Sequence, residues 1–126
     1  GDFNAVRANT VELTRGLGLF RGVIVDQHFV ARQRSNRLIS VILEHPELLG
    51  VGVDEDTAIW VRPDGRFDVI GKGSVVVLDA GGATVARAAD KTGKDLLGVH
   101  GLRVHVLLPG EGFDLGGRVP IAGGAR

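Results

Sequence analysis

The sequence predicts an α/β domain with a mixed β-sheet whose distal half is antiparallel, and three observations support this fold class. The segment GVIVDQ, over 22–27, begins as a run of β-branched residues that is typical of a strand buried on both faces. An amphipathic helix follows it. Short alternating segments separated by glycine and proline turns fill the remainder, which favours antiparallel pairing.

Two helical segments are expected in the first part of the chain. Residues 11–16 can form one or two helical turns, with Thr10 as the N-cap and a glycine as the stop. The longer helix runs from Ala31 to Glu44, because apolar side chains recur there every three or four residues. Pro46 disfavours helical backbone at the residue before it, so the helix ends there.

Strands and turns account for the rest of the sequence. The clearest hairpin spans 57–73, around the turn Pro63-Asp64-Gly65. The segment 85–94 is expected to be a short helix or a loop, and the tail 121–126 a frayed end. Further strands are expected in GVGVD (50–54), SVVVLDAGG (74–82) and GLRVHVLLPGEGFDL (101–115).

Composition excludes several classes of protein. The 126 residues fit one domain or a piece of one, and 15 basic residues cancel 15 acidic ones, so no net charge favours nucleic acid or an anionic membrane. The sequence has no cysteine, which removes disulfides and thiol nucleophiles and fits a cytoplasmic protein. It shows no apolar run long enough to span a membrane and no phosphate-binding or dinucleotide fingerprint. We therefore expect no cofactor, no nucleic-acid partner and no membrane partner.

A first group of candidate functional residues lies at the carboxyl end of the first strand. Asp26 and His28 point to the same side if the strand stays extended, and Gln27 points to the other. Strand ends that precede a helix form the usual ligand crevice of open α/β sheets. The alternative for His28 is a structural histidine satisfied by hydrogen bonds, and this is the commoner role for an isolated histidine.

Three arginines follow within the predicted helix, at Arg32, Arg34 and Arg37. The guanidinium group offers a planar fork that matches a carboxylate, so a local cluster of arginines can hold an acidic ligand. The alternative is a solvated helix face, on which residues three apart are ordinary neighbours.

The run Asp54, Glu55 and Asp56 forms the second group, directly after the second buried strand. Neighbouring carboxylates repel unless a positive group is near. One of them can orient His28, because a general-base histidine needs a partner on its other ring nitrogen. One alternative is a solvated turn, with Asp56 or Thr57 capping the next element. The least favoured is a metal site in which Asp26 and His28 join the run as ligands, because the spacing matches no defined metal-binding loop.

Two stretches together resemble one known family. The segments GLGLFRGVIVDQHFVARQRSNRLI (16–39) and LLGVGVDEDTAIWV (48–61) are similar to the C-terminal half of the cyanophycinases, which are serine-type exopeptidases of peptidase family S51 related to aspartyl dipeptidase. The likeness runs from Leu13 to Leu115 and includes FDVIGKGSVVVLDA and VHVLLPGEGFDL. It implies the C-terminal part of a class I glutamine amidotransferase-like, flavodoxin-like sandwich over residues 1–126.

The resemblance also implies roles for the candidate residues. His28 would be the general base and Glu55 the acid that orients it. The substrate would be cyanophycin, a poly-aspartate with arginine on each side-chain carboxyl, released as β-aspartyl-arginine. The residues implied to bind it are Asp26, Gln27, Arg32, Arg34 and Arg37.

This sequence departs from the family at the nucleophile. The family's nucleophile is a serine in an upstream turn that reads roughly G-T-S-A-G-A, whereas Ser35, Ser40 and Ser74 lie in no such turn. The resemblance therefore implies a chain that is inactive alone and works with an N-terminal half, as a homo-oligomer. The alternatives are a non-catalytic binding or oligomerisation module and a peptidase for other aspartyl dipeptides.

Overall fold

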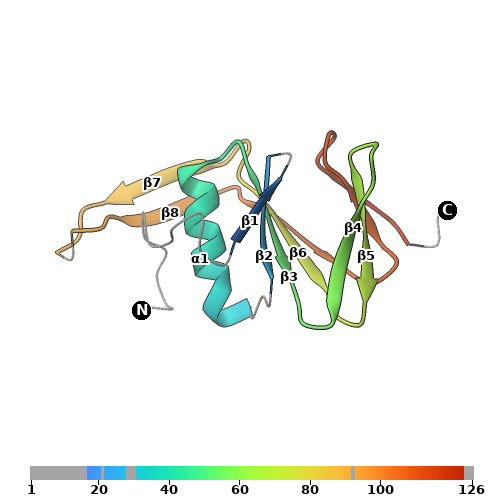
Figure 1. Ribbon diagram of the computed structural model, residues 1–126. Helices are drawn as coiled ribbons and strands as arrows, with labels where there is room; N and C mark the ends of the chain where they lie inside the picture. The colour runs from blue at the N-terminus through green and yellow to red at the C-terminus, as the bar shows by residue number, and fades with distance from the viewer. Residues whose placement is uncertain (1–16, 21, 28–30, 92, 124–126) are drawn as a thin grey trace.

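The computed structural model describes residues 17–20, 22–27, 31–91 and 93–123. The described residues form layers (Figure 1). A five-stranded sheet lies in the middle, a helix covers one of its faces, and a four-stranded sheet packs on the other. A two-stranded hairpin extends beside the helix. The expectation of an α/β protein with a mixed sheet is confirmed.

The five-stranded sheet has the strand order β1-β2-β3-β6-β9. Only β2 and β3 run parallel, and each of the other neighbouring pairs is antiparallel. The predicted antiparallel distal half is therefore correct. Its strands are β1 (Leu17–Phe20), β2 (Val23–Gln27), β3 (Leu49–Val53), β6 (Val75–Asp79) and β9 (Arg103–Leu107).

Helix α1 (Ala31–Glu44) connects β2 to β3, as the crossover between parallel strands requires. Leu38 and Ile42 have no exposed surface, and they pack on the backbone of Gly50 in β3. The close approach needs glycine there, because an added Cβ would lie 2.9 Å from Ile42 Cγ2. The predicted helix has the predicted bounds.

The four-stranded sheet has the order β11-β10-β5-β4. Its strands are β4 (Thr57–Val61), β5 (Arg66–Gly71), β10 (Gly112–Asp114) and β11 (Val119–Ile121). The predicted hairpin is confirmed, and Gly65 takes a φ of 89° in its turn. Phe67 and Phe113 stack with ring centroids 5.8 Å apart and fill the space between the two sheets.

The segment 85–94, predicted as a short helix or a loop, differs from that prediction over 85–88, whereas 89–91 and 93–94 are irregular as a loop is. It contributes β7 (Thr84–Ala88), which pairs with β8 (Leu96–His100) as an antiparallel hairpin. Every residue of β7 is exposed, so the strand lacks the apolar alternation by which a half-buried strand is recognised. Arg87 attaches the hairpin to α1 through Glu44, with Nη2 2.9 Å from Oε2.

The ends of the chain also differ from expectation in part. Strand β1 was not predicted as a strand. Ile121, assigned to a frayed tail, belongs to β11 and pairs with Gly112. The helical turns expected over 11–16, with their cap at Thr10, lie outside the described residues. Of the helices described, none combines the length and the apolar character needed to cross a lipid bilayer.

Candidate functional site

The parallel pair β2 and β3 places two strand ends at one edge of the central sheet. Asp26 is in register with Gly52, and Gln27 with Val53. The acidic turn 54–56 begins directly after β3, so it lies beside the end of β2. This is the crevice position in which open α/β sheets bind ligands.

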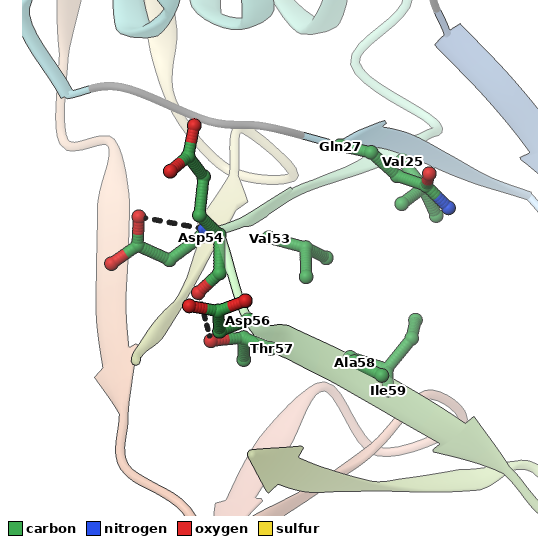
Figure 2. Close-up of a pocket in the computed structure, with 9 residues that line it drawn as sticks. Val25, Gln27, Val53, Asp54, Asp56, Thr57, Ala58 and Ile59 are labelled. Atoms are coloured by element: carbon green, nitrogen blue, oxygen red, sulfur yellow. Dashed lines mark hydrogen bonds between the residues drawn. The ribbon is translucent and has the colours of Figure 1, made fainter. Parts of the chain in front are cut away.

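A pocket of about 360 Å³ lies at this edge (Figure 2). It is formed by the end of β2, the end of β3 and the start of β4, at the opening between the two sheets. Its lining combines apolar side chains with Gln27 and the three carboxylates. The lining residues are Val25, Gln27, Val53, Asp54, Glu55, Asp56, Thr57, Ala58 and Ile59.

Hydrogen bonds hold the acidic turn in place. The Glu55 N–H donates to Asp54 Oδ1 at 3.0 Å, and the Thr57 hydroxyl donates to the Glu55 carbonyl at 3.0 Å (Figure 2). Thr57 Oγ1 also accepts the N–H of Gly73, at 2.9 Å. The Asp54 N–H donates to the Ser74 carbonyl at 3.2 Å. The turn after β3 is therefore fixed to the turn after β5.

The backbone at Asp56 adds a further contact between the turn after β3 and the turn after β5. Asp56 has a φ of 55°, a left-handed conformation that aspartate tolerates better than most residues. Its carbonyl accepts the Lys72 N–H at 3.0 Å. Gly71 has a φ of 119°, and a Cβ there would lie 2.3 Å from the Asp56 carbonyl oxygen, so the contact excludes other residues.

The Glu55 side chain is exposed at the pocket and is available to a partner. Its carboxylate makes no hydrogen bond or ion pair with any residue that the structure describes. Its backbone, in contrast, is fixed on both sides, at the N–H and at the carbonyl. A carboxylate on a rigid turn can orient a histidine or receive a cationic ligand group.

Asp26 lies on the other face of the sheet, toward α1. It has no exposed surface, and its Oδ1 accepts a hydrogen bond from Arg37 Nη2 at 3.1 Å. Ser40 Oγ, one turn further along the helix, donates to the Arg37 carbonyl at 2.9 Å. Asp26 is therefore not among the residues that line the pocket, whereas its neighbour Gln27 is.

The remaining predicted site residues are placed only in part. His28 lies outside the described residues. Arg32 and Arg34 lie in α1, but their side chains are not described. The structure thus brings Gln27 and Glu55 to one pocket and pairs Asp26 with Arg37 on the opposite face of the sheet. Among the described residues there is no group of three or more side chains of the metal-binding kind.

Gly73 was not singled out by the sequence, although its N–H bond to Thr57 holds the acidic turn. The DEDT sequence alone indicates a threonine that can cap a turn, but Gly73 lies 16 residues further along. Only the hairpin between them brings the two together. A pairing of this kind has no local sequence signal.

Comparison with known proteins gives consistent matches. The chain is 40% identical to a cyanophycinase of Geminocystis herdmanii over 113 residues, and these residues are 90% of this chain. It is 45% identical over 105 residues to a cyanophycinase of Trichormus variabilis, covering 83% of this chain. The resemblance to the cyanophycinases is confirmed. A cyanophycinase of Synechococcus elongatus matches at 40% identity over 91% of the chain.

The matches cover this chain and the cyanophycinases unequally. The chain spans 42% of the Geminocystis protein, 35% of the Trichormus protein and 36% of the Synechococcus protein. More than half of each cyanophycinase therefore has no counterpart here. No protein-family model matches the chain.

Proposed function

We propose that the chain is the C-terminal part of a cyanophycinase-like, serine-type peptidase that hydrolyses cyanophycin to β-aspartyl-arginine. The proposal rests on identities of 40–45% to proteins named cyanophycinase. It includes the fold of the whole enzyme, a class I glutamine amidotransferase-like sandwich in peptidase family S51. The central sheet with its parallel pair and crossover helix would be the distal part of that fold.

One observation of the structure supports the assignment of a base and its orienting acid. The parallel ends of β2 and β3 place Gln27 and Glu55 at the same pocket. His28 follows Gln27 directly in sequence. A base that follows β2 and an acid that follows β3 would then be neighbours at the edge of the sheet, as a base and its orienting acid must be.

His28 would act as the general base and Glu55 would orient it. A serine hydroxyl would attack the carbonyl carbon of the scissile backbone amide while His28 takes the hydroxyl proton. The leaving amine would receive that proton as the C–N bond breaks and an acyl-enzyme forms. Water, deprotonated by His28, would then attack the ester and restore the serine. Release of intact β-aspartyl-arginine requires that the backbone amide be the one cleaved.

Gln27, Arg32, Arg34 and Arg37 would hold the substrate. Gln27 lines the pocket and offers an amide to a polar group. Arg37 lies on the α1 side of the sheet, outside the pocket lining, and part of its side chain is exposed, so it would meet a substrate carboxylate outside the pocket while it stays bonded to Asp26. Asp26 has no exposed surface and would contribute by orienting the Arg37 fork.

The nucleophilic serine would come from a segment outside this chain. Ser40 lies on the buried face of α1, its hydroxyl donates to the Arg37 carbonyl, and it does not line the pocket. Ser35 also lies within α1. The chain would then be inactive by itself and would need the remaining part of the enzyme.

A second candidate is a non-catalytic binding or oligomerisation module. The edge strand β9 exposes 55% of Val104 and 60% of Val106. Val104 pairs with Leu78 and Val106 with Val76, so all four side chains lie on the face of the sheet that α1 covers. The helix does not extend over the two valines of β9. An exposed apolar strand at a sheet edge favours association, either with the rest of the enzyme or with a second copy.

The experiment is reconstitution with residue-level controls. The chain is co-expressed with the part of the Trichormus cyanophycinase that it does not match, and dipeptide release from cyanophycin is measured by mass spectrometry. His28→Ala should abolish release, and Glu55→Gln should reduce it by about 10²-fold or more, since an orienting acid supports the base in every turnover. Asp64→Asn, at the exposed tip of the β4–β5 hairpin, serves as the matched control and should leave the rate unchanged.

Retained activity in His28→Ala would remove that residue from the mechanism. Equal losses in Glu55→Gln and Asp64→Asn would show that Glu55 contributes only to folding. If the reconstituted wild-type protein binds cyanophycin but releases nothing, the binding-module candidate replaces the enzyme.

A further inference from the structure

A second pocket, of about 300 Å³, lies at the opposite edge of the central sheet. Because β6 is antiparallel to β3, the carboxyl end of β6 is at the edge where β3 begins, away from the acidic turn. Three turns meet there, after β6, before β9 and between β10 and β11. The lining residues are Asp79, Gly81, Gly82, Gly101, Arg103, Gly117 and Arg118.

A buried carboxylate anchors this pocket. Asp79 has 5% of its surface exposed, and its Oδ1 accepts hydrogen bonds from Arg118 Nη1 at 2.7 Å and from the Gly81 N–H at 2.8 Å. Arg118 Nη2 donates in addition to the Glu47 carbonyl at 2.7 Å. The guanidinium of Arg118 is therefore fixed by two acceptors from different parts of the chain.

The backbone around the pocket is shaped to this arrangement. Arg118 has a φ of 55°, an uncommon conformation for a residue with a side chain, and its two hydrogen bonds offset the cost. A Cβ at position 81 would lie 2.8 Å from Arg118 Nη1 and 2.9 Å from Asp79 Oδ1, so a larger residue there would displace the paired side chains. These contacts fix the side chains of Asp79 and Arg118 in place before any ligand binds.

The side chains that line the pocket include more positive groups than negative ones. Arg103 is in register with Asp79 on the neighbouring strand, so both side chains leave the same face of the sheet. Arg103 makes no hydrogen bond or ion pair with any described residue, and Arg118 retains N–H donors beyond the two that it uses. The side chains that line the pocket, two guanidinium groups and one carboxylate, sum to a charge of +1. The carboxylate of Asp114, outside the lining, accepts the N–H groups of Gly116 and Gly117.

We propose that this pocket binds a small molecule through a carboxylate group, held by Arg103 and Arg118. The planar forks of the two guanidinium groups match the two oxygens of a carboxylate. The volume suits a ligand of amino-acid or dipeptide size. A monoanion balances the net charge, whereas a phosphate dianion would experience repulsion from the Asp79 carboxylate. The inference is independent of the proposed peptidase activity.

The test is a nuclear magnetic resonance titration of the isotopically labelled chain with L-aspartate, and in parallel with inorganic phosphate. Aspartate should shift the amide signals of the four pocket glycines along one saturable curve. Arg103→Gln should raise the dissociation constant for aspartate at least tenfold. Arg103→Lys should raise it less, because lysine keeps the charge without the planar fork. The control Arg66→Gln removes an exposed arginine of β5 that is paired with Asp64, and it should leave the curve unchanged.

Several results would overturn the inference. These are glycine signals that do not saturate, equal binding in Arg103→Gln and wild type, and phosphate binding as tight as aspartate binding. The amide signals of Glu55 and Thr57 report separately on the first pocket. Binding there without a response of the pocket glycines would reject this site and leave the proposed function intact.

Discussion

Arg37 and Asp26 form an ion pair, with Nη2 and Oδ1 3.1 Å apart, that fastens α1 to the strand before it. The Asp26 side chain has no exposed surface, while that of Arg37 is 26% exposed. The pair joins β2 to α1, the two elements between which the proposed general base lies in the sequence. It therefore links the stability of the domain to the geometry of the proposed site.

Arg37→Gln should lower the free energy of unfolding by about 2–4 kcal/mol, because it takes the cationic partner from a buried carboxylate. Urea unfolding followed by circular dichroism measures the loss. A double-mutant cycle with Asp26→Asn should give a coupling energy of about 1–3 kcal/mol. The exposed pair Arg66 and Asp64 is the control, and its cycle should give less than about 1 kcal/mol. Equal coupling in the two cycles would contradict the structural role of the buried pair.

Gly50→Ala should destabilise the chain by about 1–3 kcal/mol, because the new methyl group collides with side chains of α1. The matched variant is Gly98→Ala in β8, where the nearest atom to an added Cβ is Ala86 Cβ at 3.8 Å. That change should alter stability by no more than about 0.5 kcal/mol. Thermal unfolding of both variants tests the packing of α1 on β3. The prediction fails if the two variants melt together.

His105→Leu should stabilise the chain by about 1 kcal/mol, since it removes a buried polar atom that lacks a partner. His105 packs against Phe113 with ring centroids 5.5 Å apart, and its Nε2 atom is buried without a hydrogen bond to any described residue. His100→Leu, at an exposed position of β8, is the control and should change stability by less than about 0.5 kcal/mol. A loss of stability in His105→Leu would mean that the imidazole has a polar role.

The β7–β8 hairpin should be the least protected of the strand pairs in hydrogen exchange, because β7 is exposed along its whole length. Arg87→Gln should lower its protection factors further, since Arg87 joins the hairpin to Glu44 of α1. The hydrogen bond to Asp95, followed by the charge of Glu44, raises the pKa of Arg87 above its ordinary value.

A raised pKa fixes the pH range of that contact. The stabilisation that the charged Arg87 gives the hairpin is fully present below the pKa of Arg87 in the unfolded chain. It is lost only when the pH rises past the higher pKa of Arg87 in the folded chain. Protection of the hairpin should therefore not fall between about pH 7 and pH 10, a range in which arginine stays charged. A fall in that range, matching the loss in Arg87→Gln, would contradict this account.

The fold could be predicted wherever burial leaves a periodic pattern. Val23 and Val25 face one layer and Ile24 the other, so an apolar run correctly indicated a strand buried on both faces. The helix was predicted because Leu38 and Ile42 lie on one stripe. Strand β7 was not, because a strand exposed at every residue has no such pattern.

The candidate site was predicted in part for a similar reason. The positions of Gln27 and Glu55 follow from strands that end at a common edge. The burial of Asp26 and its pairing with Arg37 depend on which face of β2 the helix covers, and strand alternation alone leaves that choice open. The arginine pocket around Asp79 joins turns far apart in sequence, so no local motif announces it.

The most direct test of the proposed function compares dipeptide release from cyanophycin by the chain alone and by the chain combined with the unmatched part of a cyanophycinase. The account predicts no release above background for the chain alone and serine-dependent release of β-aspartyl-arginine for the combination. Hydrolysis by the chain alone, or by the combination after its nucleophilic serine is replaced by alanine, would contradict it.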